Sequence, residues 1–313
     1  MRHGHAETSG GKSPARGSRV LALISFLAVW PTLYVLSCFG VVILLAAPGP
    51  LEGARIAAAG GFVAATAAAA YLLDRVKVRD AWLDPADAVG HGGRFAFIAR
   101  HAAPLRLTVL ILVCIGTALA AWLSPWLAAA PLLAVIGVWM YAGRPRRVHG
   151  RPKDLLYIKT LYTSAGITGF SLLVAITAVN PRGLRAWVEE VGLHTMLWVI
   201  PGLALLVRVV ADAVLCDIED VESDRMHGTE TVPVRWGTGR AWRIAMALRG
   251  VSVAVLLCAV QLPVLARVTW ATTMCTSSIV LYGTRPAWLR EWVDAGLAIE
   301  CACLWAVCTW FGG

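Results

Sequence analysis

Three aspartates in the second half of the chain have a spacing that suits metal binding. Asp217, Asp220 and Asp224 follow a long apolar stretch, and at about 100° per residue in a helix their side chains fall within an arc of roughly 60°. Carboxylates on one face repel each other unless a cation lies between them, and Mg²⁺ prefers such oxygen ligands together with water and substrate phosphate. The spacing therefore predicts a Mg²⁺ and diphosphate site. The alternative interpretation is a solvated helix end, which suits Glu219 and Glu222 because they point away from that face.

The chain that must position these aspartates is strongly apolar. Of its 313 residues, 58% are hydrophobic and 15% are charged, and the mean hydropathy is +0.68. Its eight cysteines include no Cys-x-x-Cys pair, which argues against a zinc or disulfide framework. Apolar runs of roughly 20 residues can cross a bilayer as helices, so we predict an all-α polytopic membrane helix bundle of about nine transmembrane helices. We expect a kink at Pro31. The predicted helices cover residues 21–47, 52–73, 105–123, 125–142, 155–179, 195–215, 241–263, 265–283 and 293–311.

The distribution of Lys and Arg predicts which end of the bundle faces the cytoplasm. If the N-terminus is cytoplasmic, the inner segments contain most of the basic residues, and the outer segments contain Arg55, Arg182, Arg185 and Arg267. Cytoplasmic connections of membrane proteins carry such an excess. We therefore predict an integral membrane protein, of a bacterial-type plasma membrane, whose N-terminus and active-site mouth face the cytoplasm. The net charge of +9 then reflects topology and attraction to the lipid bilayer, and we expect no nucleic acid partner.

The chain divides into a short tail and one membrane domain. Residues 1–18 are polar, basic and rich in Gly and Ser, which is typical of a disordered tail. Residues 19–313 then form a single transmembrane domain. Its long connections lie on the predicted cytoplasmic side, and polar backbone in a membrane protein is shielded or lines a cavity. We therefore expect the chemistry at the cytoplasmic mouth of the bundle.

Further charged residues are expected at the same mouth. Asp74, at the inner end of the second predicted helix, is a candidate metal ligand. Lys159 lies just inside an apolar helix and can reach the mouth by snorkelling. Arg144 and Arg147 precede it, and Arg225 lies in the acidic segment; guanidinium and ammonium groups both bind phosphate oxygens. The alternative for the arginines is that they only follow the positive-inside rule.

Charge within a membrane helix is costly and often functional, and four further residues of the predicted helices are notable for this reason. Arg208 precedes Asp212 by four residues, so the two can form an ion pair on one helix face. Whether that pair has a functional or a purely structural role stays open. Glu300 and Arg249 are also expected to be buried, and their sequence context names no partner for them.

The acidic segment resembles a motif of the UbiA-type membrane prenyltransferase family. Lys159 also occupies a place where that family often carries a Lys. The family's second aspartate motif, with its trailing Gly-x-x-Thr-Leu-Pro and Gly, is similar to Asp217-x-x-Asp220-x-x-x-Asp224, Gly228-x-x-Thr231-Val-Pro233 and Gly237.

The family's first motif, Asn-x-x-x-Asp-x-x-x-Asp, is only partly matched. Asp74 fits the middle position, whereas Ala70 stands at the Asn position and Val78 at the final Asp position. Asp80, two residues further on, is the candidate substitute for the final Asp. The chain's only asparagine, Asn180, lies on the predicted outer side.

The resemblance implies a nine-helix bundle around an intramembrane cavity and a specific chemistry. Mg²⁺ would bridge the acidic loops and an isoprenyl diphosphate donor, and loss of diphosphate would leave an allylic cation that a lipophilic or aromatic acceptor, such as a quinone precursor, attacks. The implied metal and catalytic residues are Asp74, Asp217, Asp220 and Asp224. The implied diphosphate-binding residues are Lys159, Arg144, Arg147 and Arg225.

Three other function classes compete with prenyl transfer. A UbiA-type terpene cyclase would ionise the same substrate and trap the cation with the substrate's own alkene. A CDP-alcohol transferase would resemble Asp-Gly-x-x-Ala-Arg followed by further Asp residues, a string that this sequence lacks. A non-catalytic transporter or scaffold would bind its ligand near the bilayer midplane, whereas the strongest polar cluster here is predicted at the mouth.

Overall fold

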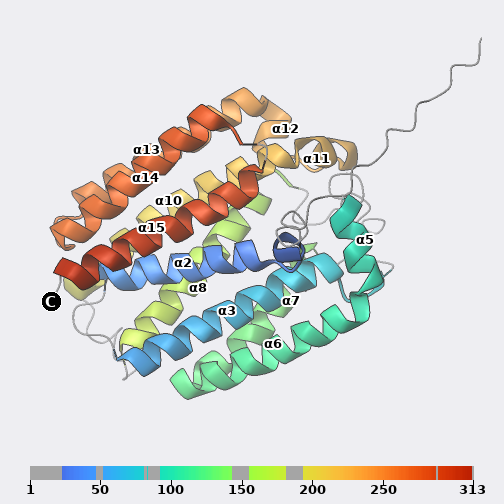
Figure 1. Cartoon of the computed structure of the whole chain (residues 1–313), viewed down its shortest axis with the longest axis horizontal. Coiled ribbons are helices and arrows are strands. Elements are labelled where there is room, and N and C mark those ends of the chain that lie inside the picture. Colours follow the sequence, from blue (N-terminus) through green and yellow to red (C-terminus); the bar gives the residue numbers. More distant parts are fainter. Residues whose placement is uncertain are drawn as a thin grey trace, which may run out of the picture.

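The computed structural model confirms an all-α polytopic membrane bundle (Figure 1). Each secondary-structure element of the described chain is a helix, and eight of these helices are long and apolar enough to cross a membrane. The predicted tail at residues 1–18 lies outside the described part. The structure describes residues 23–46, 52–80, 83, 92–142, 155–180, 193–286 and 288–311.

The eight long helices are arranged side by side in one bundle. In Figure 1, α13 and α14 form one edge of the bundle and α6 and α7 the opposite edge, with the other long helices between them. The eight are α2 (Val29–Ala46), α3 (Gly53–Val76), α6 (Ala102–Leu123), α8 (Ile158–Val179), α10 (Leu193–Glu219), α13 (Thr238–Cys258), α14 (Val264–Thr284) and α15 (Leu289–Phe311).

The predicted span at 125–142 is shorter than the others. It consists of a 3-10 helix, η2 (Pro125–Ala129), followed by α7 (Ala130–Ala142). The 13 residues of α7 are fewer than the roughly 20 that cross a bilayer as an α-helix. A count of nine spans therefore stays a prediction.

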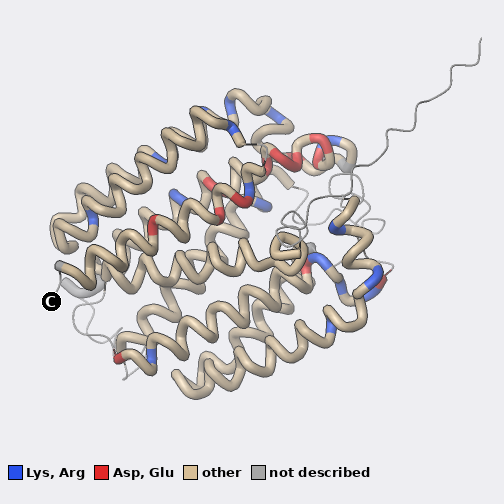
Figure 2. The backbone as a smooth tube through the Cα atoms, viewed as in Figure 1, with Lys and Arg blue, Asp and Glu red and all other residues tan. Residues whose placement is uncertain are grey.

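Three short helices lie at one end of the bundle. These are α5 (Gly92–Arg100), α11 (Val221–His227) and α12 (Val232–Trp236) (Figure 1). The positions of many Lys, Arg, Asp and Glu residues of the described chain gather towards the same end along the backbone (Figure 2). We call this end the mouth of the bundle.

The first predicted helix is interrupted close to the expected proline. Residues 23–26 are helical, the chain turns at Leu27 and Ala28, and α2 begins at Val29. Pro31 has no N–H to donate to the carbonyl of Leu27, and its ring excludes a regular helix there. Ala28 accordingly takes a left-handed φ of 60°. The interruption thus precedes the proline by one helical turn.

The central helix α10 leads to the second acidic row, which consists of Asp217, Asp220 and Asp224, at the mouth. It packs against α2, α8, α13 and α15, which explains why its residues are apolar on most sides. The helix ends at Glu219, and Asp220 joins it to α11. Gly228 ends α11 in a left-handed conformation with φ 65°, which glycine adopts without strain. The acidic segment is therefore two helices joined at Asp220 rather than one.

A neutral ionic network holds α10, α13 and α15 together within the bundle. Arg208 contacts Asp212 at 2.8 Å, as predicted, and reaches Glu300 at 2.8 Å. Arg249 contacts the other oxygen of Asp212 at 2.6 Å. Trp270 of α14 and Ser277 donate further hydrogen bonds to Glu300, at 3.2 and 2.6 Å. The network answers the open question of partners for the buried Glu300 and Arg249, and the number of pairs within it favours a structural role, although Arg208 Nη2 has no hydrogen-bond partner among the described residues.

Candidate functional site

A cavity of about 290 Å³ opens at the mouth between α2, α3, α8, α10 and α15. The residues that line it include most of those predicted to form the site. They are Asp74 of α3, Lys159 of α8, Asp217 of α10, and Asp220 and Asp224 of the segment that follows. The structure thus brings together residues that lie far apart in the sequence.

The three aspartates converge on the ammonium group of Lys159. Its Nζ lies 2.8 Å from Asp217 Oδ1, 3.3 Å from Asp224 Oδ2 and 3.7 Å from Asp220 Oδ2. Thr160 adds a 3.5 Å hydrogen bond to Asp217. A single positive charge therefore lies where the three carboxylates meet. The predicted shared face is confirmed, although the break at Asp220 separates the residues into two helices.

Arg290 is a site residue that the sequence did not reveal. It begins α15, and its guanidinium donates to Asp220 Oδ2 at 2.7 Å while its backbone N–H donates to Glu219 at 3.2 Å. The only signal was a basic residue at the predicted inner end of the last span. Its pairing with Asp220 depends on the packing of α15 against α10, which residue spacing does not report.

Asp74 is the member of the first acidic row (Asp74 and Asp80) that lies at the cavity. It lines the cavity from α3 and forms a 2.6 Å ion pair with Lys77, which ends that helix with a φ of 53°. Asp80 does not join it, because Arg106 of α6 binds Asp80 at 2.6 Å and its side chain is 72% exposed. The expectation that Asp80 replaces the missing third carboxylate is therefore wrong.

The predicted arginines are not among the described lining of the cavity. Arg225 is exposed, because it lies one residue after Asp224 on α11 and so points about 100° away from it around the helix. The predicted contact of Arg225 with diphosphate stays a prediction. Arg144 and Arg147 lie outside the described residues.

Burial changes the pKa of Asp224, one of the three converging aspartates. Burial raises the pKa of the Asp224 carboxyl to about 6; Lys159 opposes that rise, and the negative charges of Asp220 and Asp217 add to it. Burial and the neighbouring carboxylates therefore make the charged form of Asp224 less favourable than in water. A cation placed among these carboxylates stabilises the charged form.

The depth of the cavity is more apolar than its mouth. Ile167, Val209 and Val293 line it together with the rings of Tyr34 and Tyr71. The Tyr34 hydroxyl is turned to Asp212, to which it donates at 3.0 Å. The cavity therefore combines a charged mouth with a depth suited to a hydrocarbon chain.

The carboxylate oxygens at the mouth are suitable ligands for a hard divalent cation, but in this structure they form ion pairs with Lys159 and Arg290. Carboxylate oxygens are the ligands that Mg²⁺ prefers, and the position among them already holds a positive charge. Within the described ranges, no group of three or more His, Cys, Asp or Glu side chains is already gathered closely enough to hold a metal ion. The reason lies in the contacts above, since Lys159 and Arg290 hold the carboxylates that would have to turn towards a metal.

Comparison with known proteins gives matches in structure rather than in sequence. No protein-family model and no curated protein matches the chain. A UbiA homologue from Aeropyrum pernix K1 matches with a TM-score of 0.64 at 18% identity, over 89% of this chain and 98% of that one. A UbiA homologue from Archaeoglobus fulgidus, solved with DMAPP and Mg²⁺, matches with a TM-score of 0.59 at 15% identity, over 92% and 99% of the two chains. A structure of digeranylgeranylglyceryl phosphate synthase matches with a TM-score of 0.54 at 12% identity, over 93% and 97%. The chain therefore has the fold of the UbiA homologues.

Proposed function

We propose that this chain is an integral-membrane prenyltransferase of the UbiA type, which moves an isoprenyl group from an allylic diphosphate to a lipophilic or aromatic acceptor. The observation that carries the proposal is the convergence of Asp217, Asp220 and Asp224 on one cation position at the mouth of a cavity with an apolar depth. Such a cavity suits a ligand with a charged head and a hydrocarbon tail. Structural relatives bound to DMAPP or GPP with Mg²⁺ support the same ligand class here.

The second acidic row would hold Mg²⁺, with Asp74 facing it across the cavity. Bound there, Mg²⁺ stabilises the negative charge that develops on the departing diphosphate. Lys159 neutralises the carboxylates in the structure, and its ammonium is also within reach of a diphosphate at the same mouth. The flexible Lys159 side chain can therefore bind the carboxylates when no substrate is present and the diphosphate when it is bound, since an ammonium binds either group as a point charge.

The walls of the cavity protect the reaction from water. Loss of diphosphate leaves an allylic cation, and water would convert that cation into an alcohol before it met an acceptor. The apolar side chains in the depth, among them Ile167, Val209 and Val293, exclude water from the reacting carbon. The tyrosine rings nearby present π faces, which attract a positive charge.

The proposal is tested with purified protein and geranyl diphosphate. Diphosphate release is measured with Mg²⁺ and with EDTA, and we expect release only with Mg²⁺. Asp220→Ala and Asp224→Ala should each lower the rate by about a hundredfold or more, because each removes a residue that would hold the Mg²⁺ needed to stabilise charge on the departing diphosphate. Asp80→Ala is the matched control, since Asp80 is an exposed aspartate held by Arg106 away from the cavity. Unchanged turnover in both site variants would refute the proposal.

The products of the same reaction separate the competing functions. A cyclic hydrocarbon or alcohol formed without any acceptor would identify a terpene cyclase, for which the single remaining carboxylate of the first motif, Asp74, is the supporting observation. Binding of geranyl diphosphate that is equal with Mg²⁺ and with EDTA, and without diphosphate release, would identify a transporter or scaffold.

A further inference from the structure

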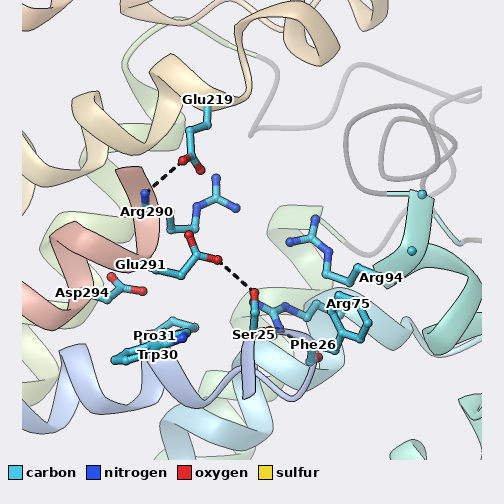
Figure 3. Close-up of a pocket in the computed structure, with 12 residues that line it drawn as sticks. Ser25, Phe26, Trp30, Pro31, Arg75, Arg94, Glu219, Arg290, Glu291 and Asp294 are labelled. Carbon is cyan, nitrogen blue, oxygen red and sulfur yellow. Dashed lines mark hydrogen bonds between the residues drawn. The ribbon is translucent and has the colours of Figure 1, made fainter. Parts of the chain in front are cut away.

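A second cavity adjoins the first at the mouth and has the same volume, about 290 Å³. Residues of α2, α3, α5 and α15 line both cavities, so the two share a wall. Figure 3 shows the lining of the second cavity. The residues common to both linings are Pro31, Arg75, Arg94, Arg290 and Asp294. The second cavity itself lies between the start of α2, the start of α5 and the start of α15.

Aromatic rings and charged groups together line the second cavity. Phe26 and Trp30 supply the rings. Arg94 extends into it from α5, while the Arg290 side chain extends from the opposite side (Figure 3). Glu291 is held by a 3.1 Å hydrogen bond from Ser25. A planar ligand with polar substituents matches this lining, because the rings offer stacking surface and the arginines offer donors to an oxygen anion.

Asp294 contributes to the shared wall a carboxyl oxygen, Oδ2, that has no hydrogen-bond partner among the described residues. The residue is 6% exposed. The carboxyl is directed to the space between Arg290 and Trp30 in Figure 3. A buried carboxylate oxygen without a donor is costly and is rare in folded proteins. A ligand that brings a hydroxyl to this oxygen would remove that cost.

We propose that the second cavity holds the prenyl acceptor and that Asp294 accepts the proton that the acceptor loses. This inference rests on the proposed function and deepens it, since it places the acceptor, which carries a hydroxyl on a planar ring, in the cavity that adjoins the donor's cavity at the residues common to both linings. In the reaction, the allylic C–O bond breaks and its electron pair leaves with the diphosphate. A new bond forms from the acceptor's ring carbon or oxygen to the allylic carbon, and the acceptor's proton passes to Asp294 Oδ2.

The placement is tested by binding of a fluorescent naphthol, 6-hydroxy-2-naphthalenesulfonate, without donor or metal. Its excited state is a strong acid, so a carboxylate next to its hydroxyl shifts its emission to that of the naphtholate. Gly93→Leu should weaken binding at least tenfold, because Gly93 lines the second cavity and a Cβ there has 3.7 Å to Phe26 and room to extend. Asp294→Asn should lower the ratio of naphtholate to naphthol emission of the bound probe at least fivefold. Glu52→Gln, a change to an exposed carboxylate at the start of α3, is the control.

Three results would overturn the inference. These are a probe that does not bind the wild-type protein, Gly93→Leu binding equal to wild type, or an emission ratio that Asp294→Asn leaves unchanged. Unsubstituted 2-naphthalenesulfonate, which lacks the hydroxyl, should bind wild type and Asp294→Asn alike; if Asp294→Asn instead weakened its binding as much as that of the naphthol, the change would be structural and the inference would fail. Because the Gly93 arm does not depend on the folding of the Asp294 variant, either variant can refute the placement.

A reaction arm distinguishes this inference from the proposed function. With geranyl diphosphate and Mg²⁺, the geranylated probe formed per diphosphate released should fall about a hundredfold in Asp294→Asn, the usual loss on removing a general base. A wild-type protein that binds the probe and releases diphosphate but forms no geranylated probe would overturn the acceptor assignment alone. A wild-type protein that releases no diphosphate with Mg²⁺ would overturn the proposed function, while the binding arm still reports on the cavity.

Discussion

Replacing Lys159 by methionine should make the stability of the protein depend strongly on Mg²⁺. The lysine contributes the charge on which Asp217, Asp220 and Asp224 converge. Methionine has a similar length and no charge, so it removes the ion-pair partner of the nearly buried Asp217, whose side chain is 5% exposed. Asp217 then lies beside two other carboxylates, of which Asp220 keeps its pair with Arg290.

The magnitude follows from the distances. Two unit charges 4 Å apart interact by about 4 kcal/mol at an effective dielectric constant of 20, and breaking a buried ion pair typically costs about 3–5 kcal/mol. The Lys159 side chain is 24% exposed, so solvent screens part of the interaction. We therefore expect a loss of about 3 kcal/mol in EDTA, at the lower end of that range.

Mg²⁺ should restore most of this loss, because a ligand that binds only the native state stabilises it. Without the competing ammonium, the affinity of the acidic face for metal should rise about tenfold, which corresponds to about 1.4 kcal/mol. The assay is thermal unfolding in detergent with EDTA and with Mg²⁺, combined with a Mn²⁺ titration followed by electron paramagnetic resonance. Arg106→Met is the control, because it breaks the exposed pair with Asp80, which is worth about 0–1 kcal/mol.

Two outcomes would refute this reasoning. One is a Lys159→Met protein as stable as wild type in EDTA, which would mean that the lysine does not neutralise the aspartates. The other is an unchanged or weaker affinity for Mn²⁺, which would mean that the ammonium and the metal do not compete for the same oxygens.

Three further predictions follow from packing and charge. Arg208→Met leaves its two buried carboxylate partners without this guanidinium, and should lower the free energy of unfolding by about 3–5 kcal/mol, seen as a lower apparent Tm. Gly40→Ala should destabilise by about 1–3 kcal/mol, because its Cβ would lie 2.6 Å from Cys301 Sγ between α2 and α15; apparent Tm again reports it. Asp74→Asn should weaken Mn²⁺ binding less than Asp217→Asn does, because the first acidic row retains one carboxylate at the cavity, and the same titration measures both.

Matched variants keep these tests specific. Gly60→Ala is the control for Gly40, because its Cβ would meet Leu36 at an ordinary 3.7 Å and should leave the apparent Tm nearly unchanged. Equal shifts in the two glycine variants, or no shift in Arg208→Met, would contradict the packing and pairing described above. Weaker Mn²⁺ binding in Asp74→Asn than in Asp217→Asn would contradict the leading role of the second row.

The features that follow from local periodicity were predictable from the sequence. The apolar runs predicted the membrane helices, and the spacing of Asp217, Asp220 and Asp224 predicted their shared face, because both depend on residues close together in the chain. Arg208 and Asp212 paired as expected for the same reason.

The features that depend on packing between distant segments were not predictable in that way. Arg290 and Asp294 reach the site only because α15 packs against α10 and α2, and no spacing within the sequence records that contact. Asp80 was misplaced for a local reason, since the left-handed backbone at Lys77 ends α3 and changes the direction of the residues that follow. Lys159 was placed at the mouth correctly, but its partners in the structure are carboxylates, and its predicted contact with diphosphate stays a prediction.

The buried network of Arg208, Arg249, Asp212 and Glu300 bears on the direction in which a ligand enters the first cavity. Two cations and two anions cancel there, and Asp212 also lines the floor of the first cavity. Because these charges cancel, the floor does not compete with the mouth for a cation or for a phosphate group. We therefore expect the charged head of a ligand to be held at one end of the cavity only, so that the ligand enters in a single direction with its tail inward.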